Sequence, residues 1–273
     1  MTKRPGILGR SYTALILFFL YAPIFILITF SFNSSNSRTV WAGFTFDHYR
    51  SLLNNSAIMN AFYTTLIIAF ISAIVATLIG TFAAIGFHNM RRRWRTPLMH
   101  INNIPMMNAD IATGISLSLL FLSLGTVLRF NLGFGTLLLA HIIFNIPYVV
   151  LSIMPKLRQL DTNLVDAACD LGCTWIKAFW KVIVPEIMPG IINGLIIAFT
   201  LSIDDFVISY FTAGGNVMTL PMQIFAMTRR RISPEINALS TILFLTVLAL
   251  LIIINVREAR QEDKQKERGK NKK

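Results

Sequence analysis

The sequence has little charge, little cysteine and none of the usual nucleotide-binding motifs. Only 14% of its 273 residues are charged, whereas a soluble domain of ordinary composition carries about a quarter. The two cysteines, Cys169 and Cys173, have no histidine nearby, which indicates free thiols rather than a metal or redox site. No Gly-x4-Gly-Lys-Ser/Thr phosphate loop occurs, so the chain is not expected to hydrolyse ATP alone. These absences exclude a soluble domain and a self-contained ATPase.

An enzyme active site is not expected either. The four histidines are scattered along the chain, and no Ser/His, metal-binding or paired-acid constellation is evident. Only His48 has an acid beside it, Asp47. That pair falls in a stretch expected to be an outer loop, where a solvated role is the simpler interpretation.

The net charge of +12 does not indicate nucleic acid as a partner. Eight of the 25 Lys and Arg residues lie in the tail 257–273, mixed with four acids, and four more are Arg91, Arg92, Arg93 and Arg95. Both groups flank apolar runs, where basic residues hold cytoplasmic loops of membrane proteins in place. The partner that this charge indicates is the lipid membrane.

Long apolar runs dominate the rest of the chain. Roughly 20 apolar residues cross the hydrocarbon core as a helix, the conformation that satisfies backbone groups in lipid. The sequence therefore predicts an all-α integral membrane protein, read as one transmembrane domain over 1–273. About six spans are expected, near 12–32, 61–87, 104–128, 136–154, 187–211 and 236–256. The first run is too long for a signal-peptide core and is expected to remain as a span.

The distribution of basic residues predicts the orientation. With both termini in the cytoplasm, nineteen Lys and Arg lie inside and six outside, as the positive-inside rule requires. The loops around 91–95 and 155–186 are then cytoplasmic, and 32–60 and 212–233 are outside. The apolar stretch 220–227 is too short to span and is expected to form an outer-surface or re-entrant helix. The outer run Arg229, Arg230 and Arg231 opposes the rule.

The loop 155–186 is longer than a connector between helices needs to be. It contains Trp175 and Trp180, which a solvated linker would not carry. We expect two short helices, the first ended at Gly172, which can adopt the left-handed conformation. The second is expected to begin after Thr174 and to end near Pro185. Such amphipathic helices need the rest of the chain or a partner to bury their apolar faces.

This loop resembles the EAA loop of the MetI-like permeases of ABC importers. The pattern Asp166-Ala167-Ala168, three residues, Gly172, nine residues and Val182-Ile183-Val184-Pro185 keeps the family spacing, with Asp for Glu and Val for Ile and Leu. The resemblance implies a type I ABC importer permease fold. It also implies that Asp166, Ala167, Ala168, Gly172 and Pro185 belong to a coupling helix seated in a separate ATPase subunit. ATP and Mg²⁺ would then be bound by that partner, and this chain would need no cofactor.

Three acids fall within the predicted spans, where a carboxylate is costly and often marks a transport pathway. Asp110 lies in the third span, and Asp204 and Asp205 are adjacent in the fifth. Adjacent helical positions point about 100° apart, so only one of this pair can face a pore; the other would cap a helix or pair with a basic residue. Phe206 and Tyr210 offer aromatic faces to a cation. A structural role for each acid remains an alternative.

Further motifs resemble the PotC-type permeases of spermidine/putrescine importers. They are Ser31-Phe32-Asn33-Ser34-Ser35, Trp41-x-Gly43-Phe44-Thr45, Asp110-Ile111, the stretch from Ser202 to Ser209, Leu220-Pro221 and Ser233-Pro234-Glu235-Ile236-Asn237-Ala238-Leu239.

This second resemblance implies a multi-pass permease of the bacterial plasma membrane that lines half of a polyamine pathway. Its partners would be a second, different permease, two ATPase copies and an extracellular substrate-binding protein. The outer arginine run would then either contact an acidic surface of that binding protein or remain solvated. Alternatives are an ABC permease for another small solute, or an ion-coupled secondary carrier, which would leave the loop 155–186 unexplained.

Overall fold

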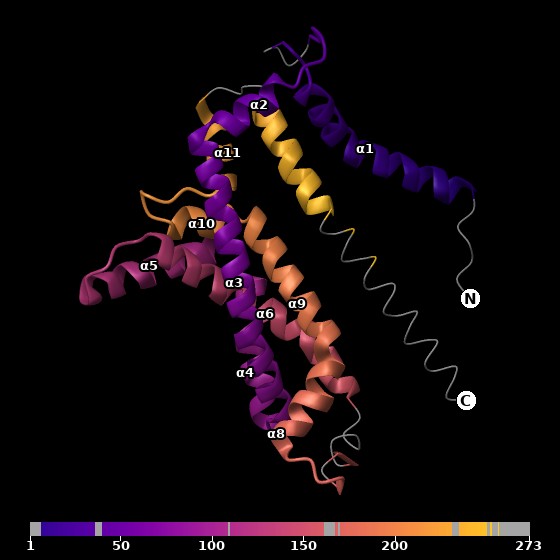
Figure 1. The fold of residues 1–273 in the computed structure, drawn as a ribbon, viewed down its shortest axis with the longest axis vertical. Helices are drawn as coiled ribbons and strands as arrows, with labels where there is room; N and C mark the ends of the chain where they lie inside the picture. Colours follow the sequence, from indigo (N-terminus) through magenta and orange to yellow (C-terminus); the bar gives the residue numbers. More distant parts are fainter. Residues whose placement is uncertain are drawn as a thin grey trace. The chain divides into compact units, whose positions relative to one another are not determined.

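The computed structural model describes residues 7–35, 40–108, 110–160, 167–168, 170–230 and 235–249, and residues 252 and 256. These residues are almost entirely helical, with one isolated antiparallel bridge between Asn33 and Phe44. The helices (Figure 1) are α1 (Ile7–Ser31), α2 (Asp47–Asn54), α3 (Ser56–Asn89), α4 (Arg92–Met107), α5 (Asp110–Leu128), α6 (Phe134–Gln159), α8 (Trp175–Ala178), α9 (Val184–Asp204), α10 (Val207–Thr212), α11 (Leu220–Arg230) and an unlabelled helix Glu235–Ala249.

Five of the described helices are long and apolar enough to cross a membrane, which confirms the predicted class of protein. They are Ser11–Ser31, Ser56–Asn89, Asp110–Leu128, Phe134–Gln159 and Ile176–Asp204. The predicted sixth span corresponds to the shorter apolar helix Glu235–Ala249, with residues 252 and 256 also helical.

The third span begins later than predicted. The predicted loop at 91–95 and the predicted span start at residue 104 both lie in α4, a separate helix that ends at Met107. The chain is extended at Asn108, with φ −79° and ψ 151°, and α5 begins at Asp110. α4 is rich in Arg, Asn and His, so it cannot extend an apolar span, and the apolar run behind the prediction belongs to two helices.

The second helix of the loop 155–186 was predicted to end near Pro185, but it continues past that residue. α8 passes into a π-helical turn at Phe179–Ile183, which leads directly into α9 with Pro185 in its first turn. Proline lacks the N–H that an α-helical turn would use, and a wider turn before it accommodates that loss. The loop and the fifth span are therefore one helical rod.

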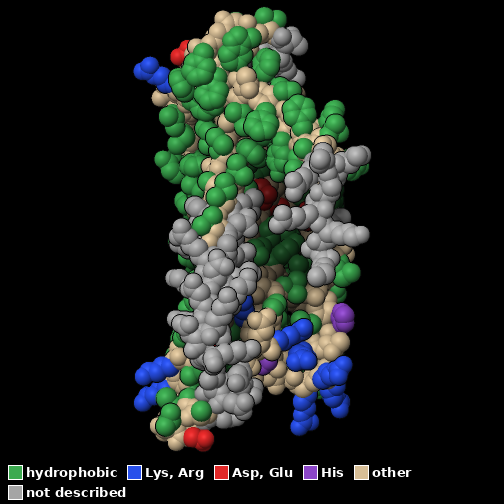
Figure 2. All heavy atoms as spheres, turned by 90° about the vertical axis from the view of Figure 1, so that its right-hand side faces the viewer, with side chains coloured by type: hydrophobic (Ala, Val, Ile, Leu, Met, Phe, Trp, Pro, Cys, Tyr) green, Lys and Arg blue, Asp and Glu red, His purple; other side chains and the backbone are tan. Residues whose placement is uncertain are grey.

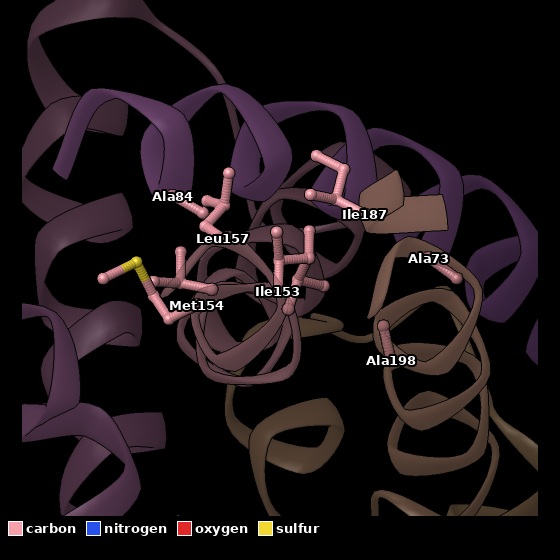
Figure 3. Packing of buried hydrophobic residues seen from close by; sticks show 9 residues of the cluster. Ala73, Ala84, Ile153, Met154, Leu157, Ile187 and Ala198 are labelled. Atoms are coloured by element: carbon pink, nitrogen blue, oxygen red, sulfur yellow. The ribbon is translucent and has the colours of Figure 1, made fainter. Parts of the chain in front are cut away.

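The chain groups into two compact units, Met1–Met59 with Gln223–Ala249, and Asn60–Met222 with Leu250–Lys273. The second unit has a core of α3, α6 and α9, in which Ala73, Ala84, Ile153, Ile187 and Ala198 pack together (Figure 3).

Small residues let α9 approach α6 closely. A Cβ added at Gly190 would lie 3.0 Å from the Ser152 carbonyl oxygen, and one at Gly194 would lie 3.2 Å from Val149 Cγ1. With Ala198, these glycines form the small-x3-small pattern typical of packed membrane helices. The close packing holds the second unit's central helices rigidly beside the site described below.

The first unit is organised around Phe32. Its ring stacks on Phe44 at 5.2 Å and lies 5.1 Å from Tyr49, whose hydroxyl is 2.7 Å from Ser31 Oγ. His48, expected to be solvated, instead has its Nε2 2.8 Å from the carbonyl oxygen of Asn33. The segments around Phe32, Phe44 and Tyr49 therefore pack against one another.

α11 confirms that a short helix covers the stretch 220–227. The Arg229 guanidinium lies 4.7 Å from the centre of the Phe225 ring, which gives this arginine a cation–π contact within its own helix. Whether the outer arginine run also contacts a binding protein stays a prediction.

Candidate functional site

The fifth span breaks at the aspartate pair, where the sequence predicted a continuous helix over 187–211. α9 ends at Asp204, Asp205 is extended with φ −64° and ψ 121°, and α10 begins at Val207. In Figure 1, α10 turns away from the line of α9. The Asp205 carboxylate accepts hydrogen bonds from the backbone N–H groups of Ile208, at 3.2 Å, and Ser209, at 2.7 Å. These bonds replace those of a continuing helix and start a new one.

Asp205 also faces a buried histidine. Its Oδ2 lies 3.6 Å from Nε2 of His141 on α6, and the two side chains are 8% and 2% exposed. The same His141 nitrogen is 3.1 Å from Ser209 Oγ. Asp205 is therefore the member of the pair that caps a helix and approaches a basic group, the structural role foreseen for one of the two.

Asp204 differs from Asp205 both in exposure and in its position relative to a helix. It is exposed, and it is the last residue of α9. The carboxyl end of a helix carries a partial negative charge, so a carboxylate there is disfavoured, whereas a cation is favoured by typically 0.3–1 kcal/mol or more. Asp204 therefore adds a negative charge to a helix end that is already negative.

Asp110 belongs to the third span, as predicted, but it lies at the very start of that span and of its helix. It is the first residue of α5 and is exposed. At the positive end of a helix its charge is stabilised by the helix itself. Of the three aspartates, only Asp204 is the last residue of a helix, where the helix dipole disfavours a negative charge.

The aromatic residues expected to accompany the acids lie just beyond the break. The rings of Phe206 and Tyr210 are 5.5 Å apart, and Tyr210 is 53% exposed. Phe211, by contrast, packs towards Gly114 on α5, where an added Cβ would lie 3.0 Å from its ring. Tyr210 therefore presents an aromatic face that a cation could reach near Asp204 along the chain.

The loop 155–186 has the turn that the sequence predicted. Gly172 has φ +82°, and the Cys173 N–H donates to the carbonyl oxygen of Ala168 at 3.0 Å, the long bond of a Schellman helix end. Asp166, the acid of the EAA-like pattern, lies outside the described residues, whereas Ala167 and Ala168 are helical. Its role stays a prediction.

At this turn and in the helix that follows it, the loop exposes large apolar side chains. Leu171 is 88% exposed, Ile176 68% and Trp180 61%. Large apolar side chains that are exposed together often mark a site of contact with another protein. The exposed face has the character of a surface that another protein covers.

Sequence reasoning missed three buried polar residues of α6 beside the break. They are Thr136, His141 and Asn145. Each bonds to a residue more than fifty positions away in the chain. Their only local signal is that they are polar residues in an apolar run.

Comparison with known proteins gives consistent matches over most of the chain. Residues 76–264 match the family described as "Binding-protein-dependent transport system inner membrane component". The spermidine/putrescine transport system permease protein PotC of Haemophilus influenzae is 37% identical over 86% of this chain and 90% of its own length. The putrescine transport system permease protein PotI of Escherichia coli is 42% identical over 82% of this chain and 81% of its own.

Solved structures show the same architecture. A chain of a bacterial ABC transporter that imports the acidic polysaccharide alginate superposes with a TM-score of 0.70, covering 93% of this chain and 95% of that one, at 15% identity. A chain of the MetNI methionine ABC transporter superposes with a TM-score of 0.60, covering 80% and 98%, at 17% identity. At such identities the likeness concerns the fold.

Proposed function

Because the chain belongs to the family of binding-protein-dependent transport system inner membrane components, we propose that it is the permease subunit through which an ATP-driven importer passes polyamines. Its fold is that of the type I ABC importer permeases. It is a multi-pass protein of the bacterial inner membrane and a transport component rather than an enzyme. Relatives that cover most of the chain are named for putrescine and spermidine transport, which supports this substrate class.

The observation that carries the substrate assignment is the position of Asp204. An exposed carboxylate at the negative end of a broken membrane helix attracts cations. A polyamine offers several ammonium groups on an apolar stem. One ammonium group can meet Asp204 while the stem lies against aromatic rings such as Tyr210.

The charges of the spans argue against an anionic substrate. No Lys or Arg occurs within 60–87, 110–128, 134–155 or 184–204, so these segments offer no positive charge to a carboxylate or phosphate. The transporter of acidic alginate has the same fold at 15% identity, so side chains rather than the fold select the substrate.

The exposed apolar loop supports a coupling role. We propose that Leu171, Ile176 and Trp180 contact a separate ATPase subunit, present in two copies, that binds ATP and Mg²⁺. The importer would also contain a second, different permease subunit and an extracellular substrate-binding protein. This chain would then form one half of the pathway and have no ATPase site of its own.

Transport by the purified complex tests the proposal. The complex that co-purifies with the tagged chain is reconstituted into liposomes with its binding protein, and uptake of labelled putrescine, spermidine, a neutral amino acid and an anionic sugar is measured with and without ATP. We expect ATP-dependent uptake of the polyamines alone. Uptake that follows an ion gradient without ATP would instead indicate a secondary carrier, and uptake of another solute would overturn the substrate assignment.

The orientation is tested with single cysteines. In a Cys169→Ser/Cys173→Ser background, a cysteine replacing Leu53, which is 68% exposed on α2, should react with a membrane-impermeant maleimide in spheroplasts. A cysteine replacing Leu171 should react only after permeabilisation. Figure 2 shows most of the visible Lys and Arg side chains in the lower part of the view, and a concentration of basic residues is expected on the cytoplasmic side. Labelling of position 171 in intact spheroplasts would contradict this topology.

A further inference from the structure

α6 holds the chain on both sides of the helix break through polar contacts. Asn145 Nδ2 donates to Ser202 Oγ at 2.8 Å, in the last turn of α9. Thr136 Oγ1 lies 2.8 Å from the carbonyl oxygen of Thr212, the last residue of α10. His141 lies between them in sequence and contacts Ser209 and Asp205. One helix thus contacts both the end of α9 and α10.

The α6 side chains that make these contacts are buried, so losing a partner would be costly. Asn145 is 0% exposed, His141 1% and Thr136 5%. A buried polar group without a partner is destabilising, so these side chains restrict the break to arrangements that keep the bonds. On α9, Ser202 Oγ also lies 3.1 Å from Ser72 Oγ of α3. The last turn of α9 is therefore held from two sides, two residues before Asp204.

His141 cannot touch a substrate in the pathway, because it is almost completely buried. Its partner Asp205 is adjacent in sequence to the exposed Asp204. The Asp205 carboxylate thus links His141 of α6 to the N–H groups of Ile208 and Ser209 that start α10. The orientation of Asp204 depends on where the chain leaves α9 and enters α10.

We infer that His141 is a positioning residue: by holding Asp205 and Ser209 against α6, it fixes the α9–α10 break and thereby presents Asp204 to the cation pathway. The inference rests on the proposed function for the nature of the cargo, but the placement of Asp204 can be measured without any cargo. The imidazole acts by its Nε2 hydrogen bond and touches no substrate.

The test compares three variants. His141→Leu fills the space without a polar atom, and His141→Gln places an amide nitrogen where Nε2 lies. His100→Leu, on exposed α4, is the matched control for the loss of a histidine. In the Cys169→Ser/Cys173→Ser background, Asp204→Cys is added to each variant. The rate of modification by a small cationic thiosulfonate is then measured on the assembled complex.

We expect His141→Leu to change the modification rate about tenfold, whereas His141→Gln and His100→Leu should stay within about twofold. With Asp204 intact, His141→Leu should raise the KM for polyamine uptake about tenfold, and this effect should largely vanish when Asp204 is already Asn, because residues that act through one another are not additive. A role in packing alone would instead lower the yield of complex without changing KM.

An unchanged modification rate in His141→Leu would overturn the inference, even if uptake fell. A changed rate in a complex that imports no polyamine would support the positioning role while contradicting the proposed substrate. Should His141→Leu fail to assemble, His141→Asn replaces it, because its shorter side chain keeps a polar group that cannot reach Ser209. A normal rate there would equally contradict the inference.

Discussion

Replacing Asp204 by Asn should lower polyamine uptake per assembled complex about fivefold or more. A carboxylate about 4 Å from an ammonium group gains roughly 4 kcal/mol at an effective dielectric of about 20. If desolvation leaves only a quarter of that, the remaining 1 kcal/mol or so corresponds to about a fivefold change. Because Asp204 is exposed at the end of α9, the neutral isostere should not disturb packing. Uptake and the amount of intact complex are measured on the same sample.

The other two aspartates are the matched controls. Asp205→Asn keeps one carbonyl oxygen but loses the charge beside His141 and the second acceptor for the α10 N–H groups. It should reduce assembly, and because it loosens the break that presents Asp204, it should also raise the KM for polyamine uptake by the complexes that do assemble. Asp110→Asn removes a charge at the start of α5, which is worth about 0.3–1 kcal/mol, and should remain close to the unmodified protein in both measurements.

The ranking of the three variants decides the site. If Asp205→Asn abolished uptake in a fully assembled complex while Asp204→Asn transported normally, the pathway residue would be Asp205. If all three variants assembled and transported normally, none of these carboxylates would form the cation site. Asp204→Glu, which keeps the charge on a longer side chain, should retain most uptake if charge rather than shape is required.

The features that the sequence predicted are those with a local or compositional signal. Apolar runs of sufficient length placed the helices α1, α3 and α6, since lipid leaves a helix as the available structure. Gly172 was predicted to end a helix because glycine adopts positive φ readily, and its φ of +82° confirms this. Two different roles for Asp204 and Asp205 were predicted from the 100° rotation between adjacent helical residues. The structure shows the capping role at Asp205, but at a helix break rather than in a continuous helix, and the pathway role of Asp204 stays a prediction.

The break between α9 and α10 was not predicted, because hydropathy does not register it. The residues on both sides are apolar, and the interruption depends on Asp205 bonding forward to Ile208 and Ser209. The contacts of His141 and Asn145 join positions 68 and 57 residues apart. A single sequence contains no local pattern that pairs such positions. The site therefore required the structure, even though its acids were visible in the sequence.

Gly172→Val should uncouple ATP hydrolysis from transport, reducing uptake about tenfold or more while the chain still assembles. The left-handed backbone at Gly172, with φ +82°, costs an ordinary residue roughly 1–2 kcal/mol and a β-branched one more. Avoiding this strain would open the turn that joins the helix at Ala167–Ala168 to α8. The direction of α8, and with it the exposed surface around Ile176 and Trp180, would then change. Uptake and substrate-stimulated ATPase activity are measured together on the reconstituted complex.

Asparagine at position 172 separates backbone strain from the presence of a side chain. A Cβ at this position would meet no atom within 4 Å, so neither Val nor Asn clashes within the chain, but Asn tolerates the left-handed conformation whereas Val does not. We therefore expect Gly172→Asn to stay coupled and Gly172→Ala to be intermediate. If Val and Asn uncoupled transport equally, the requirement at 172 would be close approach of another protein rather than the turn. If neither reduced uptake, this turn would not transmit the ATPase cycle to the membrane helices.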